Sequence, residues 1–186
     1  MMKLNLGCGL KQKAGWRNVD RYASCKPDEL VDLECFPWPW DDNSADEVLF
    51  DHSLEHLGQT GDGFIGLMRE LWRVCATGAL VQINVPDPRH DDYLGDPTHV
   101  RPITGGVLSL FSQQLNRKWS EISAANSPLG MIHGIDFEVE NHTVILDEPW
   151  LTLHGQGKIT DADLADAMRR YNNVVRANHF LLVAIK

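Results

Sequence analysis

The 186-residue chain has the length of one domain, because globular domains commonly run from about 50 to 250 residues, and we predict a single domain over residues 1–186. Its hydrophobic content of 43% excludes an intrinsically disordered chain. The 26 acidic residues outnumber the 17 Lys and Arg residues, and the net charge of −9 argues against a nucleic-acid partner, because binding to phosphates requires a cationic surface.

Five short apolar runs in the first half of the chain have the length of strands. Runs rich in Val, Ile and Leu are typical of strands that are buried on both faces of a parallel sheet. We therefore predict parallel strands at Lys3–Leu6, Arg17–Asp20, Glu29–Asp32, Asp46–Asp51 and Ala79–Val85.

An amphipathic helix is predicted between the last two of these strands. Apolar residues recur at intervals of three and four over Phe64–Ala76, and charged residues occupy the opposite side. Thr77-Gly78 follows, and a glycine there can adopt the left-handed conformation that ends helices. The segment Asp46–Val85 is therefore predicted to form one strand–helix–strand unit.

A long polar segment follows the predicted strand at Ala79–Val85. Pro86–Asn116 is rich in Pro, Gly and His, and we expect a loop with a helix around Gly106–Leu115. Long loops inside compact domains are usually lids or binding loops. We therefore expect this segment to lie near a ligand.

The C-terminal part predicts two more strands and a helix. In the strand predicted at Phe137–Leu146, the alternation of apolar and polar residues changes face near Asn141, which indicates a bulge or a tight hairpin. A helix is predicted to begin at Thr160 and to run to about Tyr171. The last strand is predicted at His179–Ile185.

The first strand ends in a Gly-x-Gly turn at Gly7-Cys8-Gly9. Glycines let the backbone approach a ligand closely, and their amides can point at an anionic group. A dinucleotide fingerprint requires a third glycine where this chain has Gln12. Only the nine residues Leu10–Asn18 remain for the crossover, so we predict at most about one helical turn there. This short crossover argues against a NAD site, whose pyrophosphate binds at the N-terminus of a full helix.

Two aspartates end the next two predicted strands. Asp20 and Asp32 are expected at the carboxyl edge of the sheet, where open α/β folds bind ligands. A carboxylate can accept two hydrogen bonds from a ribose diol. The alternative is that both aspartates only cap loops. Because both follow a Gly-x-Gly strand in succession, we favour a ligand site.

Cysteine usage and hydropathy bear on the compartment. The four cysteines show no Cys-x-x-Cys pairing, which indicates a reduced, cytoplasmic environment. No signal peptide is visible, and no apolar run approaches the roughly 18 residues that a membrane-spanning helix requires. The sequence leaves the oligomeric state open.

Four successive segments resemble motifs of class I, S-adenosylmethionine-dependent methyltransferases. They are LNLGCG, NVD, VDLECFPWPWDDNSADEVLFDHSLEHL and ELWRVCATGALVQINVP, and together they cover about Lys3–Pro86 in order and spacing. The resemblance is greatest to the broad group that contains the ubiquinone/menaquinone-type enzymes. It implies an α/β, Rossmann-like sheet of seven mostly parallel strands whose last strand is antiparallel. Its cofactor would be S-adenosylmethionine, bound at the carboxyl ends of strands one to four.

The resemblance also implies roles for individual residues. The Gly-x-Gly turn would line the methionine part of the cofactor, the first acidic residue would bind the ribose, and the second, with the residue after it, would bind adenine. The residues after the fourth strand would border the methyl group. The implied cofactor residues are Leu6, Gly7, Cys8, Gly9, Asp20, Asp32, Leu33, Asp51 and His52.

The sequence departs from the family pattern in two places. The first crossover helix is shortened, and the chain has Thr77-Gly78-Ala79 where the family usually has Pro-Gly-Gly.

A competing motif directly follows the fourth predicted strand. His52-Ser53-Leu54-Glu55-His56 matches the H-x-x-E-H pattern of inverted zinc proteases. On a helix, His52 and His56 could share a metal with Glu55 as the base. The motif directly follows a strand, however, and the methyltransferase pattern accounts for the same residues. We therefore predict no metal here, and we expect Glu55 and His56 to orient the loop.

The loop Pro86–Pro102 holds the residues that we predict for catalysis. It can fold over the cofactor, and histidine is the natural base near neutral pH. We predict that His90, His99 and Arg101 act on the acceptor. The alternatives are that His99 packs against a turn, or that His90, Asp91 and His99 bind a metal.

The sequence therefore predicts an enzyme that transfers a methyl group from S-adenosylmethionine to a small-molecule acceptor, at oxygen or nitrogen. The alternatives are a cofactor-binding protein without turnover and, with less support, a zinc peptidase.

Overall fold

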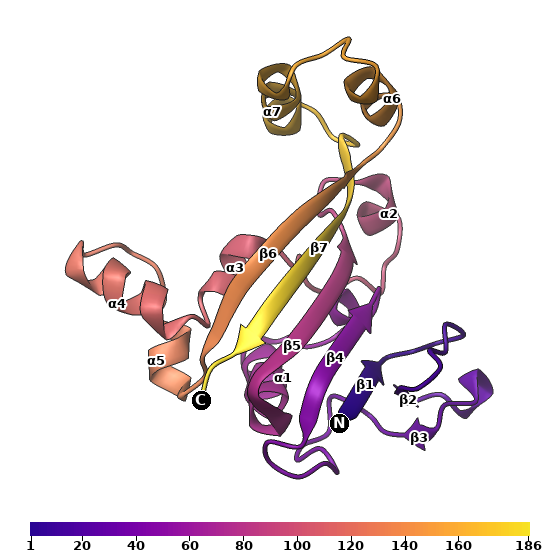
Figure 1. Ribbon diagram of the computed structural model, residues 1–186, viewed down its shortest axis with the longest axis vertical. Helices are drawn as coiled ribbons and strands as arrows, with labels where there is room; N and C mark the ends of the chain where they lie inside the picture. Colours follow the sequence, from indigo (N-terminus) through magenta and orange to yellow (C-terminus); the bar gives the residue numbers. More distant parts are fainter.

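The computed structural model describes all 186 residues, and it contains one seven-stranded sheet (Figure 1). The strand order is β3-β2-β1-β4-β5-β7-β6; only β7 is antiparallel to its neighbours β5 and β6, so the predicted mostly parallel α/β sheet is confirmed. The strands are β1 Met2–Leu6, β2 Arg17–Asp20, β3 Glu29–Leu30, β4 Ala45–Asp51, β5 Cys75–Pro86, β6 Phe137–Leu146 and β7 Val175–Ala184.

Short helices connect the strands, and the longest of them is the one predicted from its apolar stripe. None of them has the length and hydrophobicity of a membrane-spanning helix. They are η1 Ala23–Cys25, η2 Leu54–His56, α1 Gly61–Val74, α2 Asp91–Leu94, α3 Gly105–Ser109, α4 Gln113–Glu121, α5 Leu129–His133, α6 Trp150–Gly155 and α7 Asp161–Arg170.

Polar side chains cap the N-termini of two of the longer helices. The Thr60 hydroxyl accepts the N–H of Gly63 at 3.0 Å and begins α1. At α7, Thr160 and Asp163 form the reciprocal capping box, which confirms the predicted helix start.

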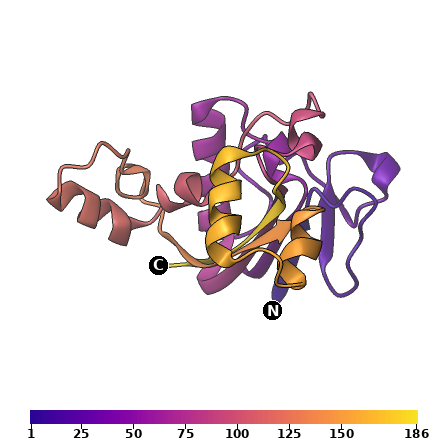
Figure 2. The same ribbon diagram turned by 90° about the horizontal axis from the view of Figure 1, so that it is seen from above.

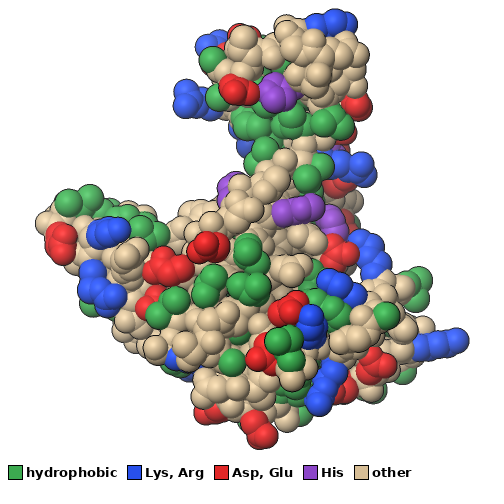
Figure 3. All heavy atoms as spheres, viewed as in Figure 1, with side chains coloured by type: hydrophobic (Ala, Val, Ile, Leu, Met, Phe, Trp, Pro, Cys, Tyr) green, Lys and Arg blue, Asp and Glu red, His purple; other side chains and the backbone are tan.

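Helices cover only one face of the sheet. Figures 1 and 2 show α1 and α3 behind the strands, whereas no helix lies over the opposite face. In β5, Val81, Ile83 and Val85 are buried toward the helices, while Leu80 is 37% exposed on the open face. The expectation of strands buried on both faces is therefore wrong for β5, whereas β1 and β4 each have three consecutive buried residues, at 4–6 and 48–50. Figure 3 shows hydrophobic, acidic and basic side chains intermixed on this open face.

The connection between β1 and β2 contains no helix, as predicted from its length. Two buried asparagines hold it in place of helix packing. Asn5 donates to the Asn18 side-chain oxygen at 2.9 Å, and the Lys13 N–H donates to the same oxygen at 2.7 Å. The Asn18 amide nitrogen in turn donates to Asp28 at 2.8 Å. Buried polar groups of this kind require partners, so these contacts fix the path of the loop.

Several element boundaries differ from the sequence predictions. Helix α1 ends at Val74, and Gly78 (φ +77°) lies inside β5, where it accompanies a register shift against β4. Strand β3 ends at Leu30, so Asp32 lies in the following loop. The single helix expected around Gly106–Leu115 is divided into α3 and α4. In β6, a register shift between Val139 and Asn141 confirms the predicted bulge.

Candidate functional site

A cavity of about 420 Å³ lies at the carboxyl ends of the first four strands. Its volume falls in the range of small-molecule and cofactor pockets. The lining residues are Gly7, Asp20, Arg21, Tyr22, Val31, Asp32, Leu33, His52, Ser53, His56, Leu57 and Thr98. Five of the nine residues predicted for the cofactor are therefore in its wall. Leu6, Cys8, Gly9 and Asp51 do not line it.

The Gly7-Cys8-Gly9 turn closes the end of β1. Gly7 and Gly9 have positive φ, at +69° and +51°. The N–H groups of Gly7 and Cys8 both donate to the carbonyl oxygen of Val19, and the N–H of Gly9 donates to Asp20 at 2.9 Å. The expectation that these amides point at an anionic ligand is therefore wrong, because the protein already satisfies them.

Asp20 is held at the end of β2 by backbone donors. One carboxylate oxygen accepts the N–H of Gly9, and the other accepts the N–H of Tyr22, each at 2.9 Å. The residue is only 8% exposed, yet it lines the cavity. Each carboxylate oxygen has a second lone pair, so Asp20 can still accept hydrogen bonds from a ligand diol.

Asp32 and Leu33 also line the cavity. A carboxylate oxygen of Asp32 accepts the N–H of Glu34 at 3.0 Å. The Leu33 carbonyl accepts the indole N–H of Trp38 at 3.0 Å, while the Leu33 N–H has no acceptor within the protein. A buried N–H without a partner is rare, so Leu33 has a donor available for a ligand in the cavity.

The end of β4 brings Asp51, His52 and Ser53 to the same edge. Burial raises the pKa of Asp51, but hydrogen bonds from Asn84 and Lys11 outweigh this effect and leave the pKa below its usual value. His52 has a positive φ of +56°, and burial lowers its pKa. The Ser53 hydroxyl donates to the carbonyl of Leu6 at 2.7 Å and joins the ends of β4 and β1.

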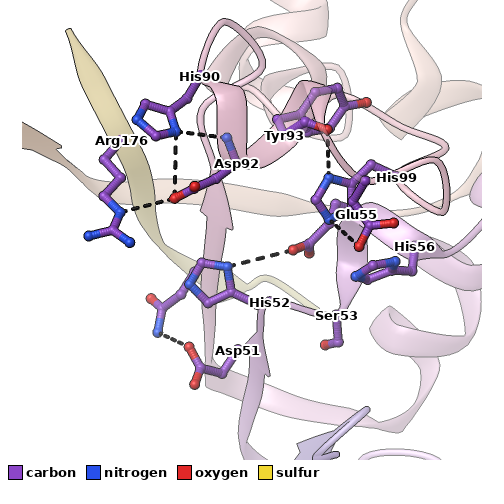
Figure 4. A network of polar contacts seen from close by, with 12 residues as sticks. Asp51, His52, Ser53, Glu55, His56, His90, Asp92, Tyr93, His99 and Arg176 are labelled. Carbon is purple, nitrogen blue, oxygen red and sulfur yellow. Dashed lines mark hydrogen bonds and ion pairs between the residues drawn. The ribbon is translucent and has the colours of Figure 1, made fainter. Parts of the chain in front are cut away.

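Behind this edge lies a cluster formed by Glu55, His56 and His99 (Figure 4). One ligand atom of each residue lies within 4.8 Å of the others. Glu55 is 1% exposed, neither of its carboxylate oxygens has a hydrogen-bond partner, and burial raises its pKa to about 7. The cluster adjoins the cavity because His56 lines it. These three residues have the donor atoms that a metal ion requires.

The H-x-x-E-H motif does not take the helical form that an inverted zinc protease requires. His52 lies in the left-handed region, and η2 is only a three-residue 3-10 helix. The structure places His56 with His99 instead of with His52.

His90, His99 and Arg101, the three residues predicted for catalysis, all lie outside the cavity wall. His90 accepts the N–H of Asp92 through Nδ1 and contacts Asp147 through Nε2, both at 3.0 Å. Arg101 donates to the carbonyls of Gly58 and Thr60 at 2.7 and 3.1 Å. Figure 4 shows His90 apart from His99, so the alternative metal site of His90, Asp91 and His99 is not formed.

Sequence reasoning missed seven residues of the cavity wall: Arg21, Tyr22, Val31, Ser53, His56, Leu57 and Thr98. Four of these directly follow or neighbour predicted residues along the chain, so extending each strand-end motif by one or two residues would have found them. Thr98 comes from the predicted lid loop. The His56 Nδ1 atom lies 2.9 Å from the Thr98 hydroxyl across 42 residues of sequence, and no local pattern indicates that contact.

Comparisons with known proteins agree on the fold. No family model and no curated protein matches the sequence. Among solved structures, a SAM-dependent methyltransferase from Archaeoglobus fulgidus has a TM-score of 0.64 at 14% identity, over 98% of this chain and 85% of that chain. A second, from Methanosarcina mazei, has a TM-score of 0.57 at 12% identity, over 99% and 92%.

A third similar structure is the [4+2]-cyclase SpnF, with a TM-score of 0.51 at 15% identity, over 99% of this chain and 74% of that chain. At these identities the likeness concerns the fold alone. The chain has the Rossmann-like fold of class I, S-adenosylmethionine-dependent methyltransferases.

Proposed function

We propose that this protein binds S-adenosylmethionine and transfers its methyl group to a small-molecule acceptor, at oxygen or nitrogen. The observation that carries the proposal is Asp20, which is held by backbone donors in the wall of a cavity at the carboxyl edge of the sheet. The order of the motifs over Lys3–Pro86 favours the group of the ubiquinone/menaquinone-type enzymes.

The residues present fit the cofactor. Asp20 lines the cavity and can accept hydrogen bonds from both ribose hydroxyls. Asp32 can accept from the adenine amine, while the free Leu33 N–H can donate to a ring nitrogen. When bound, S-adenosylmethionine supplies a methyl group on a positively charged sulfur. In this reaction the protein aligns the acceptor and accepts its proton.

The acceptor of the methyl group is proposed to bind beside the loop 86–102. Thr98 of this loop lines the cavity, and the His99 ring lies 4.6 Å from the His56 ring, which also lines it. Of the three residues predicted for catalysis, His99 is thus the one best placed. The net charge of −9 favours a small acceptor over a polyanion. Four free cysteines suit a cytoplasmic location.

The test is isothermal titration of Asp20→Ala with S-adenosylmethionine. Loss of two hydrogen bonds to a charged group is expected to weaken binding by about 2–3 kcal/mol, or roughly 30- to 150-fold. Asp28→Ala is the matched control, because Asp28 also accepts a backbone N–H, from Asn18 at 2.8 Å, but does not line the cavity. Its affinity is expected within a few-fold of the parent. Equal affinity in all three proteins would remove the cofactor assignment.

A second candidate is a cofactor-binding protein that transfers no methyl group. The observation in its favour is that a protein with this fold is described as a [4+2]-cyclase. Both candidates predict binding of S-adenosylmethionine. Only the methyltransferase releases S-adenosylhomocysteine when a mixture of small metabolites is added, and mass spectrometry of the product distinguishes the two.

A further inference from the structure

Glu55 is the least satisfied charged group in the structure. It follows β4 in the turn η2 and is 1% exposed, and both carboxylate oxygens lack a hydrogen-bond partner. The nearest basic atom is Nδ1 of His52, at 3.7 Å from Oε1. An unpaired carboxylate in such a position is costly, and cations or coordinated metals are what normally compensate it.

Two histidines present nitrogen atoms to the same place. The Nδ1–H of His99 donates to the carbonyl of Tyr93 at 2.9 Å, so Nε2 is the ring nitrogen that can bind a metal. A carboxylate oxygen of Asp96 lies 3.8 Å from this Nε2, beyond hydrogen-bond distance. The Thr98 hydroxyl donates to Asp96 at 2.6 Å and therefore accepts from Nδ1 of His56 at 2.9 Å. Histidines that bind metals are held in this way, with the second ring nitrogen donating to an oxygen.

The backbone fixes the two halves of the cluster to each other. The N–H groups of Val100 and Arg101 both donate to the Glu55 carbonyl, at 2.9 and 3.2 Å. The loop that carries His99 is thereby attached to the turn that carries Glu55 and His56. The three side chains are therefore arranged before any ligand arrives, which reduces the entropic cost of binding.

We propose that Glu55, His56 and His99 bind a divalent transition-metal ion of the zinc class. Two imidazole nitrogens and one carboxylate oxygen form a known donor set for such ions, one that leaves a coordination position open. His56 belongs both to this cluster and to the cavity wall. Where the proposed methyltransferase function holds, an oxygen or nitrogen of the acceptor would take the open position. Metal binding itself does not depend on that function.

The experiment titrates Co²⁺ into the full-length, chelator-treated protein and follows visible absorbance, without S-adenosylmethionine. We expect one Co²⁺ per chain, and Zn²⁺ should displace it. Glu55→Gln and His99→Ala should each weaken binding by about 100-fold or more, because loss of even an outer contact to a metal ligand commonly costs 10- to 100-fold. His154→Ala is the matched control, since His154 pairs with exposed Asp161 far from the cluster, and it should bind as the parent does.

A second readout covers the case in which a variant folds poorly. Zn²⁺ should raise the melting temperature of the parent, because a ligand that binds only the folded state stabilises it. It should not raise that of Glu55→Gln, whose side chain keeps the shape of glutamate. If the parent binds no Co²⁺, or if parent and Glu55→Gln bind it equally, the proposal is overturned. The proposed methyltransferase function is tested separately, by the titrations of Asp20→Ala with S-adenosylmethionine.

Discussion

Gly7 and Ser53 are in direct contact beneath the proposed cofactor cavity. A Cβ added to Gly7 would lie 2.6 Å from the Ser53 Cβ, and Gly7 has a φ of +69°, which favours glycine. Ser53 also donates to the carbonyl of Leu6. The ends of β1 and β4 can therefore approach this closely only because residue 7 has no side chain.

Gly7→Ala is expected to destabilise the protein by about 2–4 kcal/mol, the combined scale of backbone strain and steric overlap. Urea denaturation at neutral pH measures the loss. Gly15→Ala provides the comparison, because Gly15 has a similar φ of +79° but nothing within 4 Å of its added Cβ. It should show only the backbone strain, of about 1 kcal/mol. Equal losses in the two variants would show that the contact with Ser53 has no energetic weight.

The residues of the site divide into those that a strand end predicts and those that only packing reveals. Asp20 and His52 follow strands that are apparent in the sequence, and both line the cavity. The pairing of His56 with His99 arises because the loop after β5 folds back onto the turn after β4. Such a contact depends on the tertiary path of the loop, so periodicity and spacing carry no signal for it.

At the scale of elements, strand pairing overrides the local pattern that defined α1. The apolar stripe continues to Ala76, but Cys75 pairs with Ala45 and is already part of β5. Gly78 has a positive φ because strand pairing is irregular there, and it does not end the helix. Helix α6 was missed for a related reason, since its six residues form too short a segment for a 3.6-residue period to be recognised.

Helix α1 also holds the segment that carries Leu33. Glu70 accepts the N–H of Trp38 at 2.7 Å and two hydrogen bonds from Arg73, at 2.8 and 2.9 Å. The indole of Trp38 in turn donates to the Leu33 carbonyl. The proposed adenine wall is thus attached to the helix layer through one half-buried ion pair.

Glu70→Gln is expected to lower stability at pH 7 by about 1–3 kcal/mol, because the amide keeps the shape but loses the charge-assisted bonds. Hydrogen bonds from Arg73 lower the pKa of Glu70 below 4.5, its ordinary value. The stability gained from ionisation is therefore complete above about pH 4.5 and is lost as the pH falls through the lower folded-state value.

The measurement is the urea midpoint of parent and Glu70→Gln as a function of pH. Their difference should be constant near neutral pH and should shrink below about pH 4.5. Glu140→Gln, at an exposed position, should match the parent throughout. A difference that persists unchanged to low pH would mean that the charge of Glu70 is not the cause.

At the scale of the whole molecule, the chain keeps the seven strands of its fold but has helices on only one face of the sheet. The resemblance implied the mostly parallel sheet with an antiparallel last strand, and the chain length between β1 and β2 predicted the short first crossover. The open face is not apparent in the sequence. In β5, Val and Ile alternate with Leu80, Gln82 and Asn84, and such a strand resembles one that is buried on both faces. Lys3 and Glu47 pair at 2.7 Å, a contact that provides polar cover where other sheets have a second helix layer.

The loop 86–102 contacts two separate parts of the molecule. Arg89 donates to the carbonyl of Met168 at 2.6 Å, and His90 contacts Asp147 after β6, so one end of the loop is attached to the α6–α7 pair. The other end, with Thr98 and His99, is attached to the turn after β4. The two histidines therefore occupy different structural settings within one loop.

The last prediction uses this difference. His90→Ala removes two hydrogen bonds of a residue that is 5% exposed, so it should cost about 1–3 kcal/mol and lower the melting temperature by several degrees. Cofactor binding and turnover should then fall together, because the whole loop loosens. His99→Ala should instead leave cofactor affinity within a few-fold and slow methyl transfer by about 10², since it removes one of the three proposed metal ligands beside the cavity but no residue of the cavity wall. Calorimetry with S-adenosylmethionine and release of S-adenosylhomocysteine measure the two effects separately. If His99→Ala transfers methyl groups at the parental rate, this loop has no part in acceptor activation, and catalysis rests on alignment and on the residues that end β4.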